Sequence, residues 1–405
     1  MEKIPAVITP LDDHMGLDIA RSLGRHGIPV FSIDSDPNVP GRYSKYCHFI
    51  QGPSPEKKSE KEFVQFLIEF SRKLGCKPVL YPLSDLHVLV CSKYRTILQQ
   101  YYEYLMPPHE TMENLTTKSG LNLLVQKFDI PAPRTVFISD PEEITKISDQ
   151  LSYPVILKPT ESTYWHTPQI AKVLRGGLLS GRAKVILCQT SQELIDAYRR
   201  ISILDNRLVV QEVIPGEDRR LVYVSFYLDR NSKPLGIFAG RKYRIIPVGF
   251  GSASYVRSFY DPKLIEIGKK LVYATQYQGL VGIEFKEDPR DGSYKLIEVN
   301  TRFGMWDGLG VKCGVDLPYI SYCDTLGLPV NPQLTYRENI TWIDWQRDIR
   351  AVSQYWQMGQ LSFGEWFRSL LGEKMWAIYS ADDWRPGVAF TFSLVFKMFD
   401  RLLKH

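Results

Sequence analysis

Two acidic residues and one amide have the types and spacing of a metal site. Glu298 and Asn300 are two positions apart in the run Tyr294–Asn300, which predicts a strand, so their side chains share one face. Glu284 lies inside the apolar run Val281–Lys286, where an unpaired carboxylate is costly. Carboxylate and amide oxygens suit Mg²⁺, which also accepts phosphate ligands. The alternative is that both strands line a solvated face and the acids point to water.

Two lysines and a linker have the chemistry to hold a nucleotide. Lys118 lies early in a predicted helix, and Lys158 ends a predicted buried strand just before Pro159. Each ammonium could neutralise phosphate charge or be an ordinary surface residue. The run Arg207–Asp218 predicts a strand and then a Pro-Gly turn, whose backbone could read an adenine edge with an acid just beyond for ribose. A plain connection between strands with solubilising acids is the alternative.

The elements that must position these residues alternate in type along the first third of the chain. Short apolar runs at Ala6–Thr9, Pro29–Asp34 and Pro78–Pro82 predict strands, and helical periodicity separates them, as in Phe63–Leu74. Such alternation predicts a parallel sheet of Rossmann-like type with covered faces. The turn Thr9–Gly16 lacks GxGxxG, and no P-loop occurs in the chain, so a dinucleotide site in this region is not expected.

The second half predicts a different architecture. The segment Leu264–Tyr277 has helical periodicity, and it leads into the runs Val281–Lys286 and Tyr294–Asn300, which the turn at Asp291–Gly292 joins as a hairpin. The fold class that follows is α/β, with an α+β C-terminal half.

Composition excludes several classes of protein. The 405 residues are 44% hydrophobic, and 50 basic against 45 acidic residues give a net charge of +5, which does not indicate a nucleic-acid binder. Six cysteines without a CxxC pair predict free thiols, and there is no HExxH zinc motif. The apolar run Val388–Phe396 is about half the ~20 residues that a membrane span needs, and no signal peptide is evident. A cytoplasmic protein is expected.

Taken together, these motifs resemble the ATP-grasp superfamily. The resemblance covers roughly residues 5–330 and rests on TTKSGLNLLVQKFDIPAP, YPVILKP, VVQEVIPGED, GLVGIEFK and IEVNTRFG. Within the superfamily, GRKYRIIPVGFGSASYV and the opening TPLDDHMGLDIARSLGRHGIPV are similar to the predicted ATP-dependent carboligase branch, itself similar to carbamoyl-phosphate-synthase-like and D-aspartate-ligase-like members. The resemblance implies a Rossmann-like pre-ATP-grasp domain at 1–110, an ATP-grasp domain at 111–330 with a lid at about 150–210, and a helical, Trp-rich extension at 331–405.

The resemblance also implies roles for individual residues. ATP phosphates would be bound by Lys118 and Lys158, and one or two Mg²⁺ ions, or Mn²⁺, by Glu284, Glu298 and Asn300. Adenine would be held by Gln211, Glu212 and Val213, and ribose would be bound by Glu217 or Asp218. Arg302 would stabilise the transferring phosphoryl group or the acyl phosphate, and Lys158 would also be catalytic.

Two departures from the family pattern concern loops. The usual Asn-Pro-Arg is Asn300-Thr301-Arg302 here, which predicts a looser loop and a less certain aim for Arg302. The phosphate-covering loop, Arg175–Lys184, is poor in glycine, which predicts either weaker cover over ATP or cover that forms only once the acceptor substrate binds.

The reaction that follows is the ATP- and Mg²⁺-dependent joining of a small carboxylate donor to an amine acceptor through an acyl phosphate. Such chemistry needs positioning and charge neutralisation rather than a nucleophilic side chain. Arg241, here assigned a catalytic role, forms a basic cluster with Lys242, Arg244 and Arg257 that could hold the donor, or could be a solvated sheet edge. Two alternatives remain: biotin-independent carboxylation through carboxyphosphate, and an ATP-binding scaffold without turnover.

The extension 331–405 lies outside the resemblance. In its last part Phe392, Val395, Phe396, Phe399 and Leu403 could share one helical face. Such a helix could dock on the enzyme, pair with a second copy in a homodimer, or make peripheral contact with an anionic membrane.

Overall fold

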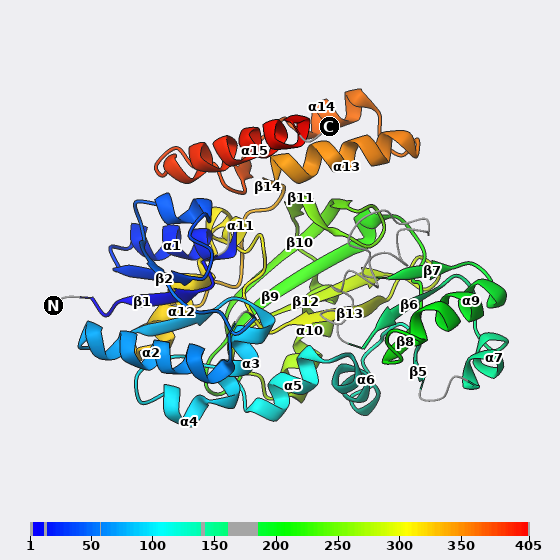
Figure 1. The fold of residues 1–405 in the computed structure, drawn as a ribbon, viewed down its shortest axis with the longest axis horizontal. Coiled ribbons are helices and arrows are strands. Elements are labelled where there is room, and N and C mark those ends of the chain that lie inside the picture. Colours follow the sequence, from blue (N-terminus) through cyan, green and yellow to red (C-terminus); the bar gives the residue numbers. More distant parts are fainter. Residues whose placement is uncertain (1–2, 12–13, 57, 139–141, 161–184, 404–405) are drawn as a thin grey trace.

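The computed structural model describes residues 3–11, 14–56, 58–138, 142–160 and 185–403, and side chains as far as residue 396. The glycine-poor loop Arg175–Lys184 lies outside the described residues. So do the side chains of Phe399 and Leu403. Three sheets organise the chain, and the larger hydrophobic clusters lie between the sheets and the helices that cover them (Figure 1).

The N-terminal sheet is parallel, as the alternation predicts. Its order is β3-β2-β1-β4, and each neighbouring pair is parallel. The helix α2 begins with a capping box in which Ser59 and Glu62 exchange hydrogen bonds, and it ends at Gly75 with φ +68°. The strands are β1 (Ala6–Thr9), β2 (Val30–Asp34), β3 (His48–Gln51) and β4 (Val79–Pro82), and the helices are α1 (Met15–Arg25), η1 (Pro40–Tyr43), α2 (Glu60–Leu74), α3 (Asp85–Lys93) and α4 (Arg95–Leu98).

A smaller antiparallel sheet forms a separate layer, to the right in Figure 1. Its order is β5-β8-β6-β7, and it has its own apolar cluster with α7 and α9. Two helices lead into it. The elements of this region are α5 (His109–Thr116), α6 (Lys118–Lys127), β5 (Thr135–Ile138), α7 (Glu143–Ser148), β6 (Val155–Pro159), β7 (Ile186–Cys188), α9 (Ser191–Ser202) and β8 (Leu208–Glu212).

The central sheet has seven strands in the order β13-β12-β9-β10-β11-β14-β15. Alternation along β9 divides its side chains: Val222 and Val224 pack toward α10, whereas Tyr223 and Tyr227 face α11 and α12. The predicted hairpin is β12 with β13. The elements are η3 (Asp218–Arg220), β9 (Leu221–Leu228), β10 (Pro234–Ile246), β11 (Ser252–Ser258), α10 (Pro262–Ala274), β12 (Gly279–Glu287), β13 (Tyr294–Asn300), α11 (Gly308–Cys313) and α12 (Leu317–Thr325).

The C-terminal region adds helices and two short strands. β14 pairs with β11, and β15 lies beside β14, so this region extends the central sheet as well as carrying the expected helices. In Figure 1 its helices form a layer across one end of the molecule. The elements are β14 (Thr341–Ile343), α13 (Trp345–Gln357), α14 (Phe363–Ser369), β15 (Lys374–Trp376) and α15 (Arg385–Leu403).

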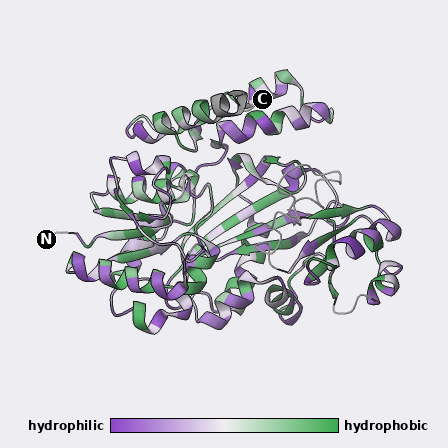
Figure 2. Cartoon of the chain, viewed as in Figure 1, coloured by the Kyte–Doolittle hydropathy of each residue, from purple (hydrophilic) through white to green (hydrophobic). Residues whose placement is uncertain are grey.

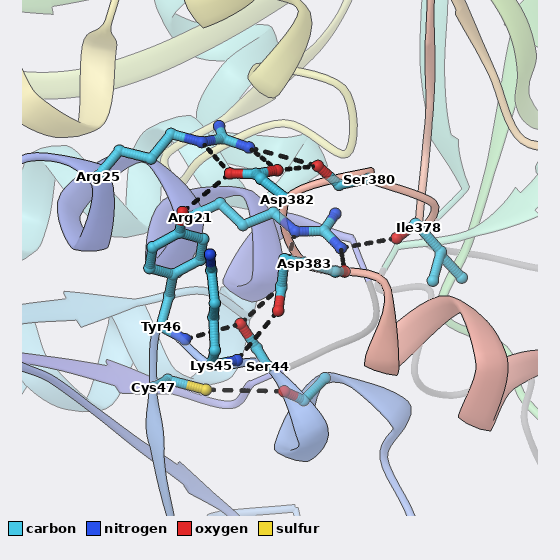
Figure 3. A network of polar contacts seen from close by, with 11 residues as sticks. Arg21, Arg25, Ser44, Lys45, Tyr46, Cys47, Ile378, Ser380, Asp382 and Asp383 are labelled. Carbon is cyan, nitrogen blue, oxygen red and sulfur yellow. Dashed lines mark hydrogen bonds and ion pairs between the residues drawn. The ribbon is translucent and has the colours of Figure 1, made fainter.

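Polar contacts hold this layer to the N-terminal unit (Figure 3). Arg21 on α1 donates from Nε to Asp383 at 3.0 Å, and the hydroxyl of Ser44 donates to the same carboxylate at 2.7 Å. On the other side, Arg244 of β10 makes a two-pronged ion pair with Asp348 of α13, at 2.7 and 2.9 Å. Both pairs are buried, so the C-terminal layer joins the first sheet to the central one.

No helix within the described ranges is both long enough and apolar enough to cross a membrane.

Candidate active site

Glu284 and Glu298 face each other across the hairpin of β12 and β13. They are register partners, and Asn300 is two positions further on, opposite Gly282. Cross-strand partners in an antiparallel pair project from the same face, so the hairpin brings the two carboxylates and the amide together. The face is the one that Tyr223 shares, since Tyr223 is the partner of Glu284 on β9.

The lysines approach this acidic pair from two other elements. Lys158 ends β6 and donates to Oε1 of Gln211 at 2.7 Å, and Lys118, the first residue of α6, donates to the backbone oxygen of Thr160 at 3.2 Å. Burial first and then the charge of Lys118 lower the pKa of Lys158, Glu298 acts in the opposite direction, and the net result is a pKa of about 7. Two ammonium groups are therefore close to each other with one carboxylate in range, an arrangement that favours an added anion.

Arg302 completes the cluster from the loop after β13. Its Nε donates to Asp85 of α3 at 2.7 Å. Burial disfavours the guanidinium charge, but Asp85, Tyr223 and Glu298 outweigh burial and raise the pKa of Arg302. The candidate site thus combines one arginine, which Asp85 holds, with two lysines and two carboxylates.

The buried carboxylate of Asp307 holds the loop after β13 in place. Asp307 accepts from the backbone N–H of Gly304 at 2.6 Å and from the hydroxyl of Ser225 on β9 at 2.7 Å. Burial raises the pKa of Asp307, and these two hydrogen bonds oppose the rise. The loop that carries Arg302 is consequently tied to the central sheet, which restrains the Asn-Thr-Arg sequence expected to be loose.

Comparisons with known proteins find relatives by sequence. The chain is 24% identical over 281 residues to a D-aspartate ligase from Enterococcus faecium, an alignment that covers 67% of this chain and 64% of that protein. It is 26% identical over 211 residues to the carbamoyl phosphate synthase large chain of Methanothermobacter thermautotrophicus, covering 50% of this chain and 18% of that one. The chain therefore spans less than two thirds of either relative. No protein-family profile matches it.

Solved structures show the same fold. An L-amino acid ligase from Bacillus licheniformis matches 80% of this chain and 74% of its own, with a TM-score of 0.56 and 17% identity. A biotin carboxylase from Campylobacter jejuni matches 84% of this chain and 75% of its own, with a TM-score of 0.61 and 17% identity. This chain has the ATP-grasp fold. In this fold Glu284 and Glu298 lie on the central sheet, Lys158 lies on the smaller sheet, and Arg302 contacts Asp85 of the N-terminal unit.

The donor set fits Mg²⁺ with a nucleotide. Among the described residues no three His, Cys, Asp or Glu side chains surround one point. The protein's share would therefore be the carboxylates of Glu284 and Glu298 and the amide of Asn300, and phosphates and water would supply the remaining ligands, as Mg²⁺ prefers. The lysines Lys118 and Lys158, whose charges lie within range of each other, fit the phosphates.

The structure brings Lys242, rather than Arg241, to the cluster. Lys242 is buried and donates to Glu284 at 2.5 Å. Arg241 is in register with Val222, on the opposite face of the ATP-grasp sheet, where it bonds the backbone oxygen of Arg219 and stacks on Phe259. Successive strand residues alternate between faces, so only one of these two neighbours can reach the site.

The nucleotide linker is partly engaged within the protein. The backbone N–H of Glu212 donates to Arg134 at 2.9 Å, and that of Val213 to Pro154 at 3.3 Å. The Glu212 carboxylate pairs with Arg290 at 2.7 Å. These two N–H groups are therefore not free to read an adenine edge in this structure.

The two acids expected near ribose differ in exposure. Glu217 is exposed, and among the described residues its only ion pair is with Arg219, two positions along the chain. Asp218 is buried and accepts from the Tyr355 hydroxyl and from the backbone N–H of Gly249. Asp218 thus holds α13 against the sheet, a structural task that its place beside Glu217 in the sequence does not reveal.

Proposed function

We propose that this ATP-grasp protein is an ATP- and Mg²⁺-dependent ligase that joins a small carboxylate to an amine. The observation that carries the proposal is the pairing of Glu284 with Glu298 across the β12–β13 hairpin, with Lys158 within range of the charges of both Lys118 and Glu298. Arg302 lies on the loop after β13, within range of Glu298. The names of the D-aspartate ligase, the D-alanine–D-alanine ligase of Pseudomonas entomophila and the L-amino acid ligase support the same class. ATP would be converted to ADP and phosphate in the reaction.

The chemistry has two steps. An oxygen of the donor carboxylate attacks the γ-phosphorus of ATP, the bond to the bridging oxygen breaks, and ADP leaves. The amine nitrogen then attacks the acyl carbon of the acyl phosphate, phosphate leaves, and the amine loses a proton to solvent. Bound Mg²⁺ would supply charge neutralisation at the phosphates.

The side chains have distinct tasks in this scheme. Lys118 and Lys158 hold the phosphates of ATP, and Arg302 faces the charge that develops on the moving phosphoryl group. Lys242 replaces Arg241 as the basic residue of the floor strands positioned to hold the donor carboxylate, since it lies beside Glu284. Glu217 is the remaining candidate for ribose, and Gln211 contacts Lys158 rather than a free space.

The decisive test measures ADP release across a panel of acids and amines. We expect a defined acid and amine pair to stimulate ADP release, and Glu298→Gln to lower the rate by about 10²-fold or more, because one of two metal carboxylates is lost. Glu287→Gln is the matched control: Glu287 pairs with Arg220 and Arg241 away from the cluster. Unchanged turnover in Glu298→Gln would show that the metal assignment is wrong.

Carboxylation through carboxyphosphate is the second candidate, and the structural neighbours favour it. These include an N5-carboxyaminoimidazole synthetase from Staphylococcus aureus and a biotin carboxylase domain from Hydrogenobacter thermophilus in complex with MgADP and bicarbonate. Bicarbonate-dependent ADP release without any organic acid would select this function. Thermal stabilisation by Mg-ATP without phosphate production in any mixture would instead indicate the non-catalytic scaffold.

A further inference from the structure

The C-terminal layer exposes apolar side chains in helical stripes. On α15, Val388, Phe392, Val395 and Phe396 follow the spacing of one helical face, and all four are exposed, Phe392 by 71% and Phe396 by 77%. More than half of the exposed large hydrophobic side chains among the described residues lie between residues 345 and 396. Figure 2 shows hydrophobic residues along α15 in this outer layer.

The stripe on α15 continues onto α13. Trp345 and Ile349 lie one helical turn apart on α13 and are exposed, and the ring of Trp345 contacts that of Trp376, with centroids 6.2 Å apart. Trp376 in turn lines an apolar hollow of about 560 Å³, together with Val388 and Phe392. We call this continuous surface, from Trp345 through Trp376 to Phe396, the apolar face. Soluble proteins rarely expose a contiguous apolar surface of this kind without a binding role.

Charges around the apolar face are unevenly compensated. Each acid between residues 345 and 396 has a partner within the protein. Glu365 accepts from its own helix cap, and the ion pairs are Asp348 with Arg244, Glu373 with Arg337, Asp382 with Arg25 and Asp383 with Arg21. In contrast, the exposed side chains of Arg350, Arg368 and Arg385 make no ion pair within the described residues. The sequence adds Lys397, Arg401 and Lys404 against the single acid Asp400.

We propose that the apolar face is a docking surface for an anionic lipid bilayer, on which α15 lies in the plane of the interface. Exposed Trp and Phe side chains flanked by uncompensated basic residues are the features that bind helices to such interfaces. No helix in the described part could span the bilayer, so the contact is peripheral. A second copy across a two-fold axis fits less well, because it would bring the same uncompensated cations together. The proposal is independent of the ligase function.

The test is flotation of the full-length chain with vesicles of phosphatidylcholine alone or with 30% phosphatidylglycerol. We expect wild type to float with the anionic vesicles and to be lost at high salt. The double variant Arg350→Gln, Arg385→Gln should weaken binding about fivefold for each cation removed. Phe392→Ser with Phe396→Ser should weaken it by about tenfold or more. Ile203→Ser, which changes an exposed apolar side chain outside the layer, should bind as wild type.

Several outcomes would overturn the proposal. The proposal is wrong if the wild-type protein does not float with anionic vesicles. This measurement uses no variant, so a folding defect in a variant cannot explain its result. Equal binding to neutral and anionic vesicles would remove the role of the cations. A dimer in light scattering that the two phenylalanine substitutions dissociate, without vesicle binding, would assign the apolar face to a second copy.

Discussion

Lys158 and Lys118 bring two positive charges together in a partly buried place, and the consequence can be measured. A lysine whose pKa falls to about 7 in the folded protein is mostly neutral at pH 8, whereas in the unfolded chain it is protonated. Folding therefore releases a proton between about pH 7 and 10. The destabilisation caused by this lysine is complete below about pH 7 and decreases as the pH rises toward 10. An anionic phosphate beside it would restore the charged form.

We expect binding of Mg-ATP to take up about one proton at pH 8 and almost none at pH 6. Calorimetric titrations in two buffers of different ionisation enthalpy give the number of protons directly. The variant Lys158→Met should show no such difference between the two pH values, and Lys127→Met, on the last turn of the same helix as Lys118, serves as a distant control. Equal proton uptake by wild type and Lys158→Met would place the linked proton elsewhere.

At this scale the sequence alone predicts the acids and the lysines as candidate site residues, but it does not predict which side chains lie beside them. The acids stand out because a carboxylate inside an apolar strand is unusual, as Glu284 is. Arg241 and Lys242 are adjacent and both basic, so composition gives no reason to prefer one, and the strand's face is decided only by its pairing with β9. Asp218 has its partner Tyr355 137 residues away, beyond the reach of any local pattern.

Among the elements, the loop after β13 depends on one buried carboxylate. Asp307 holds the backbone of Gly304 and the hydroxyl of Ser225, and through them it fixes the position of Arg302. Its removal leaves a buried N–H and a buried hydroxyl unpaired, at about 1–3 kcal/mol for each group. Asp307 is a positioning residue, since it acts on the site only through the loop.

Asp307→Ala should lower kcat by about tenfold to 10²-fold while the dissociation constant for Mg-ATP changes little, because the lysines are untouched. Steady-state ADP release combined with nucleotide titration separates the two effects. Ser225→Ala removes only one of the two hydrogen bonds and should cost less. A loss of nucleotide affinity as large as the loss of rate would contradict a role confined to the loop.

Local patterns predicted several elements. The apolar run Ala6–Thr9 matches β1, and the periodicity of Phe63–Leu74 predicts α2, which in the structure begins three residues earlier, at Glu60. In contrast, β14 and β15 have three residues each, and a run that short carries no period. Their place in the central sheet comes from pairing with β11, a long-range contact.

For the whole molecule, the joint between the first and last parts of the chain rests on buried charge. The side chains of Arg21 and Asp383 are only 3% and 1% exposed, whereas the nearby pair Arg25 and Asp382 is 43% and 41% exposed. Removing one partner of a buried pair leaves the other charge without water or a counter-charge. In an exposed pair, water hydrates the charge that remains. The two pairs come from the same helix and the same loop, so they form a matched comparison (Figure 3).

Arg21→Ala should lower the free energy of unfolding by about 3–5 kcal/mol, and Arg25→Ala by less than about 1 kcal/mol. Urea denaturation followed by circular dichroism measures both. Similar losses in the two variants would mean that burial does not govern this joint. The double variant Arg21→Met with Asp383→Leu should recover part of the loss, because neither charge is then left alone.

The same joint has a consequence for how the protein is made. Arg21 and Asp383 are 362 positions apart, so a ribosome releases the arginine long before its carboxylate exists. Until then Arg21 on α1 lacks its counter-charge, although all four strands of the N-terminal sheet have been made. Nascent chains arrested just before residue 378 should therefore expose α1 to protease, and chains carried well past residue 383 should not.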